Sequence, residues 1–142
     1  MADITLQVPS IILPQAWTIG IETENLNNLV VHYSIEFPVR YLQEKTIQVY
    51  AVEIIVFGAA GNLQLWVEVS PYPSTLSALY WAQLGGITTL VPTNVNLTAH
   101  RAVLPWTAHS EYARLAAQMP VAAAPATAFW TIQAIFEAKA GG

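Results

Sequence analysis

The residues that could do chemistry in this 142-residue chain are few, and the most suggestive of them are consecutive. His109, Ser110 and Glu111 supply the three residue types of a hydrolytic triad. Immediate neighbours on an extended chain point to opposite faces, so the Ser110 hydroxyl cannot meet the His109 imidazole as a triad requires. No Gly-x-Ser-x-Gly elbow offers another nucleophile. We therefore predict no catalytic residues and expect the protein not to be an enzyme.

A second grouping could bind a metal ion. His32 and Glu36 are four residues apart, which places both side chains on one side of a β-strand. His100 or His109 would complete a zinc site if folding brought it close. Nothing in the spacing selects for such a site, and Asp3 is the only aspartate, too few for a calcium loop. We predict no metal site and no cofactor.

Aromatic side chains are the remaining candidates for binding. Trp66 falls on the polar side of an alternating segment, Tyr72, Tyr80 and Trp81 surround a Pro-rich turn, and Trp106 follows a proline. A tryptophan on a face that should contact water is typical of protein interfaces. The same set could instead be a stacking platform for a sugar or could cap one end of the core. Core, subunit interface and ligand platform all remain open for these five residues.

These side chains are carried by a chain in which apolar and polar residues alternate with period 2, the pattern of strands with one buried face. Segments 45–57 and 63–69, joined by the turn 58–62, predict a β-hairpin. Apolar residues lie on both faces at 54–57, so we expect both faces to be covered there. Ser74 is a candidate N-cap for a short helix over 76–84, which Gly85 and Gly86 would end. Further strands are predicted at 17–21, 29–37, 87–91, 96–104 and 128–138. Segment 111–119 fits either a strand or a helix with the stripe Tyr112, Leu115, Ala116 and Met119, and we favour the strand.

The pattern predicts an all-β fold: an antiparallel β-sandwich or jelly roll with one short inserted helix. By length the chain is one domain, residues 1–142. We expect residues 1–14 to form an N-terminal arm, 121–127 an Ala/Pro loop and 139–142 a flexible tail.

The composition excludes several kinds of partner. The formal net charge is −4 and the five Lys and Arg residues are scattered, so we expect no binding to nucleic acid. The longest apolar run, 54–60, is far shorter than the roughly 20 residues that span a membrane, so we expect no membrane partner. Cysteine is absent, which excludes disulfides. The N-terminus lacks the basic start and apolar core of a signal peptide, so either none is used or a leader has been removed. Met1 favours the first, and we expect synthesis in the host cytoplasm without a signal peptide.

The same composition points to neighbouring subunits. Hydrophobic residues make up 54% of the chain and charged residues 10%, against roughly a quarter charged in ordinary soluble domains. The mean hydropathy is +0.43. A lone domain of this size has too few charged residues to cover its outside, so we expect a homo-oligomer in which apolar strand faces and loop aromatics pack against neighbours.

In its whole-chain character the sequence resembles small β-sandwich virion proteins, especially the head-decoration or cementing subunits of tailed bacteriophages. The features that carry the resemblance are the start Met1-Ala2-Asp3, the alternating strands 63–69 and 130–136, and the Ala/Pro loop 121–127. The resemblance implies a structural protein of the virion, often a trimer, with the major capsid subunit as a partner. The alternative is a carbohydrate- or receptor-binding β-sandwich in which Trp66, Tyr72, Tyr80 or Trp81 lines a shallow groove for a glycan.

Overall fold

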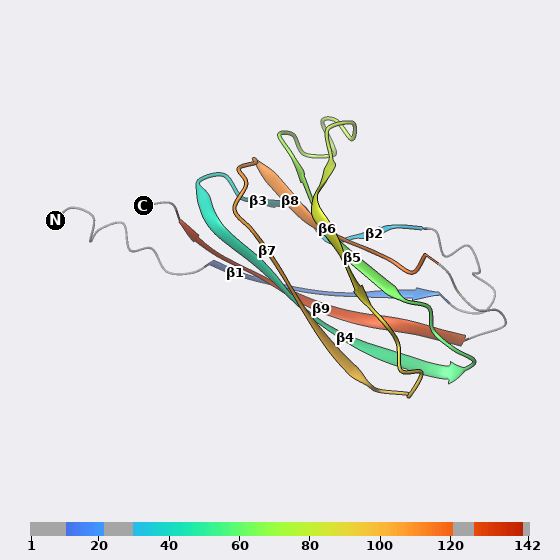
Figure 1. Ribbon diagram of the computed structural model, residues 1–142. Coiled ribbons are helices and arrows are strands. Elements are labelled where there is room, and N and C mark those ends of the chain that lie inside the picture. The colour runs from blue at the N-terminus through green and yellow to red at the C-terminus, as the bar shows by residue number, and fades with distance from the viewer. Residues whose placement is uncertain (1–10, 22–29, 121–126, 141–142) are drawn as a thin grey trace.

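Two antiparallel β-sheets form the protein, as predicted, in a computed structural model that describes residues 11–21, 30–120 and 127–140 (Figure 1). Within these ranges there is no helix, and so none that could cross a membrane. The strands are β1 (Ile11–Ile21), β2 (His32–Tyr33), β3 (Phe37–Pro38), β4 (Leu42–Phe57), β5 (Leu63–Ser70), β6 (Ala82–Leu90), β7 (Ala99–Trp106), β8 (Tyr112–Gln118) and β9 (Thr127–Ala140).

The order of the strands is that of a jelly roll. The first sheet has the order β1-β9-β4-β7, and the second has the order β2-β8-β5-β6, with β3 also paired to β8. If β2 and β3 count as one interrupted strand, two four-stranded sheets result, the double Greek-key arrangement of jelly-roll domains. The edge strands that carry prolines follow the rule that proline is tolerated at an edge, with Pro14 in β1 and Pro105 in β7.

One apolar core lies between the two sheets. The alternating residues of β4, β7 and β9 face it from the first sheet, and those of β5 and β8 face it from the second. Phe136 links the layers, because its ring centre lies 4.4 Å from that of Phe37 in the second sheet and 5.8 Å from that of Trp106 in the first. The largest buried apolar side chains are Trp130, Phe136, Ile47, Leu63, Leu65, Leu115, Met119, Ile132 and Val39.

The predicted helix over 76–84 is wrong. The N–H groups of Leu76 and Ser77 both donate to the carbonyl of Pro73, which makes a single turn that goes no further. The hydroxyl of Ser74, expected to cap the helix, donates instead to the carboxylate of Glu36. One turn fixes several dihedral angles for few hydrogen bonds, so without a cap it does not propagate. From Ala82 the chain joins β6.

The predicted hairpin between 45–57 and 63–69 is also wrong in its pairing, although both segments are strands. β4 pairs with β7 and β9, so both of its edges are occupied in the first sheet. β5 lies in the second sheet between β6 and β8. The turn between them crosses from one sheet to the other: the Ala60 N–H donates to Asn94 Oδ1 (2.9 Å), and the Gly61 carbonyl accepts from Trp130 Nε1 (3.0 Å).

The predicted strand 29–37 is broken into β2 and β3, and part of its expected buried face is outside. Ser34 is buried, whereas Tyr33 and Ile35 are exposed. The Ser34 hydroxyl oxygen accepts the N–H of Leu115 (2.9 Å), a donor that a regular ladder would give to a backbone carbonyl. This side-chain bond replaces ladder pairing and interrupts the strand.

The ends of the chain differ from the prediction in detail. β1 begins at Ile11 and pairs with β9, so residues 11–14 of the expected arm belong to the sheet. β9 continues to Ala140, two residues into the expected tail. Residues 1–10, 141–142 and nearly all of the Ala/Pro loop lie outside the described residues. The strand predicted at 96–104 lies at 99–106, and those at 111–119 and 128–138 are confirmed within two residues.

Candidate interaction surface

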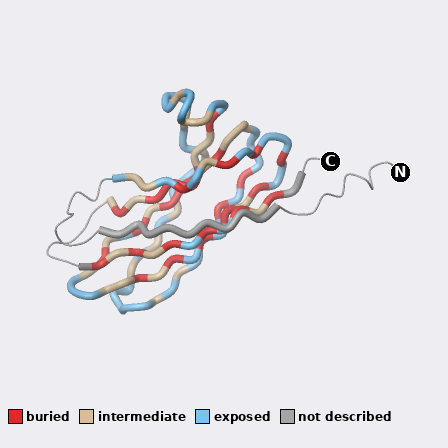
Figure 2. The backbone as a smooth tube through the Cα atoms, turned by 180° about the vertical axis from the view of Figure 1, so that it is seen from behind, coloured by how far each residue is buried: buried red, intermediate tan, exposed pale blue. Residues whose placement is uncertain are grey.

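The loop between β5 and β6, residues 71–81, projects away from both sheets and is largely exposed (Figures 1 and 2). Its apolar side chains face outward: Leu79 is 91% exposed, Leu76 70% and Tyr80 55%. Single exposed leucines are ordinary on protein surfaces, but several on one projecting loop form an apolar patch. We call residues 71–81 the projecting loop.

The base of the projecting loop is held by hydrogen bonds. The Ser70 hydroxyl accepts the N–H of Tyr72 (3.0 Å) and donates to the carbonyl of the same residue (2.7 Å). Glu36, in the second sheet's β2–β3 connection, accepts the Ser74 N–H (2.9 Å) as well as the Ser74 hydroxyl. The base of the loop is therefore fixed to its own domain, which lowers the conformational entropy that the loop would lose on binding a partner.

Arg114 of β8 fixes the other end of the loop. Its guanidinium carbon lies 3.7 Å from the ring centre of Tyr33 and 4.2 Å from that of Trp81, so the cation is held between two aromatic rings. It donates through Nε (3.0 Å) and Nη2 (2.8 Å) to one oxygen of Glu68. The other Glu68 oxygen accepts the indole N–H of Trp66 (2.9 Å). These side chains form a stacked layer on the outer face of the second sheet, which consists of Tyr33, Trp66, Glu68, Trp81 and Arg114.

The five aromatic candidates therefore separate into two groups. Trp66 does lie outside the core, as alternation predicted, but it is only 7% exposed. Trp106 is buried in the core against Phe136. Trp81 is half-buried with Arg114 at its ring, whereas Tyr72 and Tyr80 are exposed and meet edge-to-face, with ring centres 5.3 Å apart and planes at 67°. Trp66 and Trp106 are thus removed from the surface, and Tyr72 and Tyr80 remain on it.

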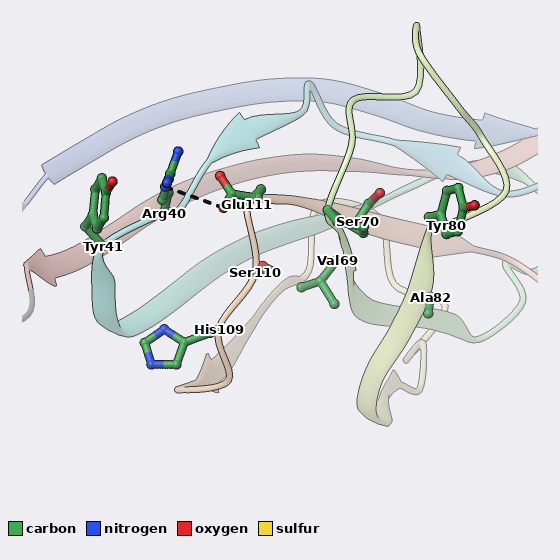
Figure 3. Close-up of a pocket in the computed structure, with 10 residues that line it drawn as sticks. Arg40, Tyr41, Val69, Ser70, Tyr80, Ala82, His109, Ser110 and Glu111 are labelled. Atoms are coloured by element: carbon green, nitrogen blue, oxygen red, sulfur yellow. Dashed lines mark ion pairs between the residues drawn. The ribbon is translucent and has the colours of Figure 1, made fainter.

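A pocket of about 540 Å³ opens at the foot of the projecting loop (Figure 3). Its two charged residues, Arg40 and Glu111, form an ion pair with each other (3.5 Å). Tyr41, at the rim, is 73% exposed and has a positive φ of 70°. This conformation belongs to the turn between β3 and β4, which the Leu42 N–H closes by donating to the Val39 carbonyl (3.0 Å) and whose third residue takes a positive φ. The full lining is Arg40, Tyr41, Val69, Ser70, Pro71, Tyr80, Ala82, His109, Ser110 and Glu111.

The pocket contains the three residues of the triad-like sequence, but not in a catalytic arrangement. The Ser110 hydroxyl donates to the carbonyl of Tyr112 (3.1 Å). The His109 ring points away from Ser110 and Glu111 (Figure 3). The carboxylate of Glu111 faces Arg40. Among the contacts of the described residues, the Ser110 hydroxyl is therefore bonded to the backbone and not to His109 or Glu111.

The metal-site candidates are not brought together either. Glu36 is bonded to Ser74, and His100 is bonded to Glu53, so each has another partner. Within the described ranges no three His, Asp or Glu side chains gather as ligands for a metal ion.

A buried carboxylate holds a second surface segment, residues 93–98, in place. Glu53 of β4 is fully buried and accepts from the N–H groups of Thr93 (3.0 Å) and Asn94 (2.7 Å), from the Thr93 hydroxyl (2.9 Å) and from His100 Nε2 (2.6 Å). Burial opposes ionisation of this carboxyl, but the bonds from His100, Thr93 and Asn94 outweigh it and place the pKa of Glu53 below its usual value. Glu53 thereby holds residues 93–98 against the end of β4.

We call residues 93–98 the held segment. This segment and the neighbouring Val91 carry apolar side chains that are exposed. Val91, Val95 and Leu97 are exposed, and so are Val56 and Phe57 at the end of β4. The expectation that both faces are covered at 54–57 is therefore wrong for Val56 and Phe57 within the isolated chain. Leu97, like Tyr41, combines an exposed side chain with a positive φ, here 66°.

One feature of the sequence links these surfaces and was missed in the sequence analysis. Residues 69–100 contain no Asp, Glu, Lys or Arg. They comprise the projecting loop, the edge strand β6 and the held segment. Charged side chains often protect an edge strand from pairing with another chain, and β6 has none. Its regular pairing with β5 is interrupted by a register shift between Leu65 and Val67, and Gly85 of β6 has a φ of 76°. We call residues 69–100 the charge-free flank.

Fold and surface together define an all-β domain of two antiparallel sheets with an apolar, charge-free flank. A comparison of the sequence with protein families and with curated proteins finds no match. Solved structures do match in fold. A chain in the structure of the infectious bursal disease virus Gx strain is 8% identical with a TM-score of 0.53, over 96% of this chain and 34% of that one.

Two further matches have lower TM-scores. The vertex protein P5 of PRD1 is 10% identical (TM-score 0.49, over 92% of this chain and 96% of that one). The carbohydrate-binding module CBM28, specific for non-crystalline cellulose, is 12% identical (TM-score 0.48, over 89% and 73%). In a further match, to dimeric latent PorU from Porphyromonas gingivalis, this chain spans only 13% of the solved chain. At such identities the likeness shows the fold alone, and one fold hosts many functions.

Proposed function

We propose that the protein is a non-enzymatic structural subunit that assembles with copies of itself through the charge-free flank. Interface centres are depleted of charged residues and enriched in aromatic and large apolar ones. In the charge-free flank, 32 consecutive residues lack formal charge, and their exposed side chains include Leu76, Leu79 and Leu97. This coincidence of missing charge and exposed apolar groups is the observation that carries the proposal.

We place the assembly in a virion, as a capsid or capsid-decoration subunit, in which a trimer contacts the major capsid subunit. The jelly-roll strand order supports this setting, because viral capsid domains use it, although lectin domains do so as well. The resemblance to head-decoration subunits lies in the whole-chain character of the sequence and includes no specific motif, so the strand order is the main support for this setting.

The alternative of a glycan-binding module is less well supported by the aromatic side chains. Stacking on a sugar needs an exposed aromatic face, and in the edge-to-face contact of Tyr72 and Tyr80 the edge of one ring covers a face of the other. The ring of Trp81 is already stacked by Arg114.

The test is to place a charge on the flank. Leu79→Glu would put a carboxylate in the contact and weaken self-association about 100-fold or more, because an unpaired buried charge costs several kcal/mol. Val103→Glu is the matched control: Val103 is exposed on the outer face of the first sheet, and its variant should associate like the wild type. Sedimentation velocity measures both. A Leu79→Glu variant that assembles normally, or a glycan titration that quenches tryptophan fluorescence, would favour the alternative.

A further inference from the structure

A lysine is buried at the end of the first sheet where β4 and β7 pair. Lys45 is only 1% exposed, although charged side chains are almost never fully buried without a partner. The pairing of β4 with β9 has a register shift between Leu42 and Lys45, and a bulge of this kind can re-aim a side chain. Trp106 lies directly opposite Lys45 on β7, and the Lys45 nitrogen is 5.9 Å from the centre of its ring. The fold thus brings a buried ammonium beside an indole.

The ammonium of Lys45 has no negative partner among the described residues. Its Nζ donates to the carbonyls of Leu42 (2.9 Å) and Thr107 (3.4 Å), which leaves one of its three hydrogens without an acceptor among them. Burial lowers the pKa of Lys45 below its usual value, as expected where no charge compensates the loss of water. An anion beside this ammonium would supply the missing compensation.

Trp106 adds a second donor that lacks an acceptor. Its side chain is 8% exposed, and its indole N–H is buried without a hydrogen-bond partner among the described residues. Deprotonation of Lys45 would remove the buried charge but would leave this N–H unsatisfied. One acceptor group placed between the two side chains would satisfy both.

Lys45 and Trp106 line the same pocket, which has a volume of about 490 Å³ and is completed by Glu44, Thr46, Pro105 and Thr107. A carboxylate has two oxygens, each of which accepts charge-assisted bonds of about 2.8 Å, so a single carboxylate can reach both donors. The negative charge of Glu44 in the wall repels an anion with two charges, such as sulfate, more than an anion with one.

We propose that this pocket binds a carboxylate, with one oxygen accepting from Lys45 Nζ and the other from Trp106 Nε1. The carboxylate belongs either to a small molecule or to a neighbouring copy of the chain, and the two sources are distinguishable by experiment. The pocket residues lie outside residues 69–100, so this site does not depend on the proposed function.

Acetate is the probe, and the indole N–H signals in ¹H–¹⁵N NMR spectra report its binding. In buffer free of carboxylates, acetate should move the Trp106 signal downfield, because a hydrogen bond deshields the donated proton. The Trp130 signal is the internal control: its N–H already donates to the Gly61 carbonyl, so it should stay in place.

Two variants remove one donor each and should remain folded. Lys45→Met is similar in length and leaves no charge to bury, so it should be at least as stable as the wild type and should not bind acetate at concentrations that saturate the wild type. Trp106→Phe identifies the indole signal by its loss. Its affinity for acetate, followed by the backbone amide signals of residues 44–46, should fall about 10-fold or more.

Acetamide, which has the shape of acetate without its charge, should bind at least about 10-fold more weakly than acetate. If a neighbouring copy supplies the carboxylate, the Trp106 signal of the assembled protein already lies downfield, acetate leaves it there, and dilution to the monomer moves it upfield. A Trp106 signal that neither acetate nor dilution moves, an equal response to acetamide, or unchanged acetate binding by Lys45→Met would overturn the proposal. None of these results would alter the proposed function, which sedimentation of the flank variants tests separately.

Discussion

The guanidinium carbon of Arg114 lies 4.2 Å from the centre of the Trp81 ring, and this contact joins the end of the projecting loop to β8. Arg114 also pairs with Glu68, which holds the indole N–H of Trp66. These linked contacts bury Trp66 on the side of the second sheet opposite the core, and they set the position of the projecting loop.

Removal of this arginine should loosen the loop and unpair a carboxylate. We expect Arg114→Met to lower the free energy of unfolding by roughly 2–4 kcal/mol, because Glu68 loses its partner in a mostly buried site. Arg114→Lys should cost less but remain damaging, since an ammonium cannot keep both the two-donor bond and the stacking. Urea unfolding followed by tryptophan fluorescence measures both.

Arg101→Lys is the control for that series. Arg101 is exposed on β7, so its variant should stay within about 0.5 kcal/mol of the wild type. Equal stability of Arg114→Met and the wild type would show that the stacked layer contributes nothing.

The buried Glu53 predicts a loss of stability in acid. The pKa of Glu53 is lowered by folding, so its contribution is complete above the unfolded value of about 4.3 and is lost as pH falls through the folded value. Glu53→Gln should cost about 2–4 kcal/mol at pH 7, because the amide cannot accept all the hydrogen bonds of the carboxylate. The gap between wild type and variant should narrow below about pH 4.

Urea unfolding at a series of pH values measures this gap. Glu111→Gln is the matched control: its carboxylate forms only an exposed ion pair with Arg40 (3.5 Å), so the variant should differ from the wild type by about 1 kcal/mol or less at any pH. A gap between wild type and Glu53→Gln that stays constant from pH 7 to pH 3 would contradict the assignment.

Two core tryptophans should respond differently to the same substitution. Trp130 donates its indole N–H to the Gly61 carbonyl (3.0 Å), whereas the indole N–H of Trp106 is buried and meets no acceptor among the described residues. Trp130→Phe should therefore cost about 2–3 kcal/mol, and Trp106→Phe about 1 kcal/mol or less, because the second change also removes an unsatisfied donor. Thermal or urea unfolding ranks the two variants. Equal costs would show that the lost ring volume alone decides, and the reverse order would contradict the role given to the indole N–H of Trp130.

The sequence was sufficient for the all-β class and for most strands, because alternation reports which face is buried. It was insufficient where a side chain replaced backbone pairing, as Ser34 does toward Leu115. The helix over 76–84 failed for a similar reason, since Ser74 bonds to Glu36, far away in sequence. The prediction that β4 pairs with β5 was wrong because alternation identifies strands but not the sheet to which each strand belongs.

The candidate surface was partly predictable. Tyr72, Tyr80 and Trp81 were singled out from sequence and lie on or beside the projecting loop. Trp66 was placed on the correct side of its strand, but only long-range contacts with Glu68 and Arg114 determine that it is covered. The absence of formal charge over residues 69–100 is visible in the sequence and would have outlined the flank directly.

The most direct test of the central claim is the sedimentation velocity of the wild-type protein over a wide range of concentrations. A subunit that must cover its charge-free flank should sediment as a discrete oligomer, or as larger assemblies, at every concentration well above its dissociation constant. A single 15.5 kDa species that persists at the highest concentrations would contradict the claim that neighbouring copies cover this flank.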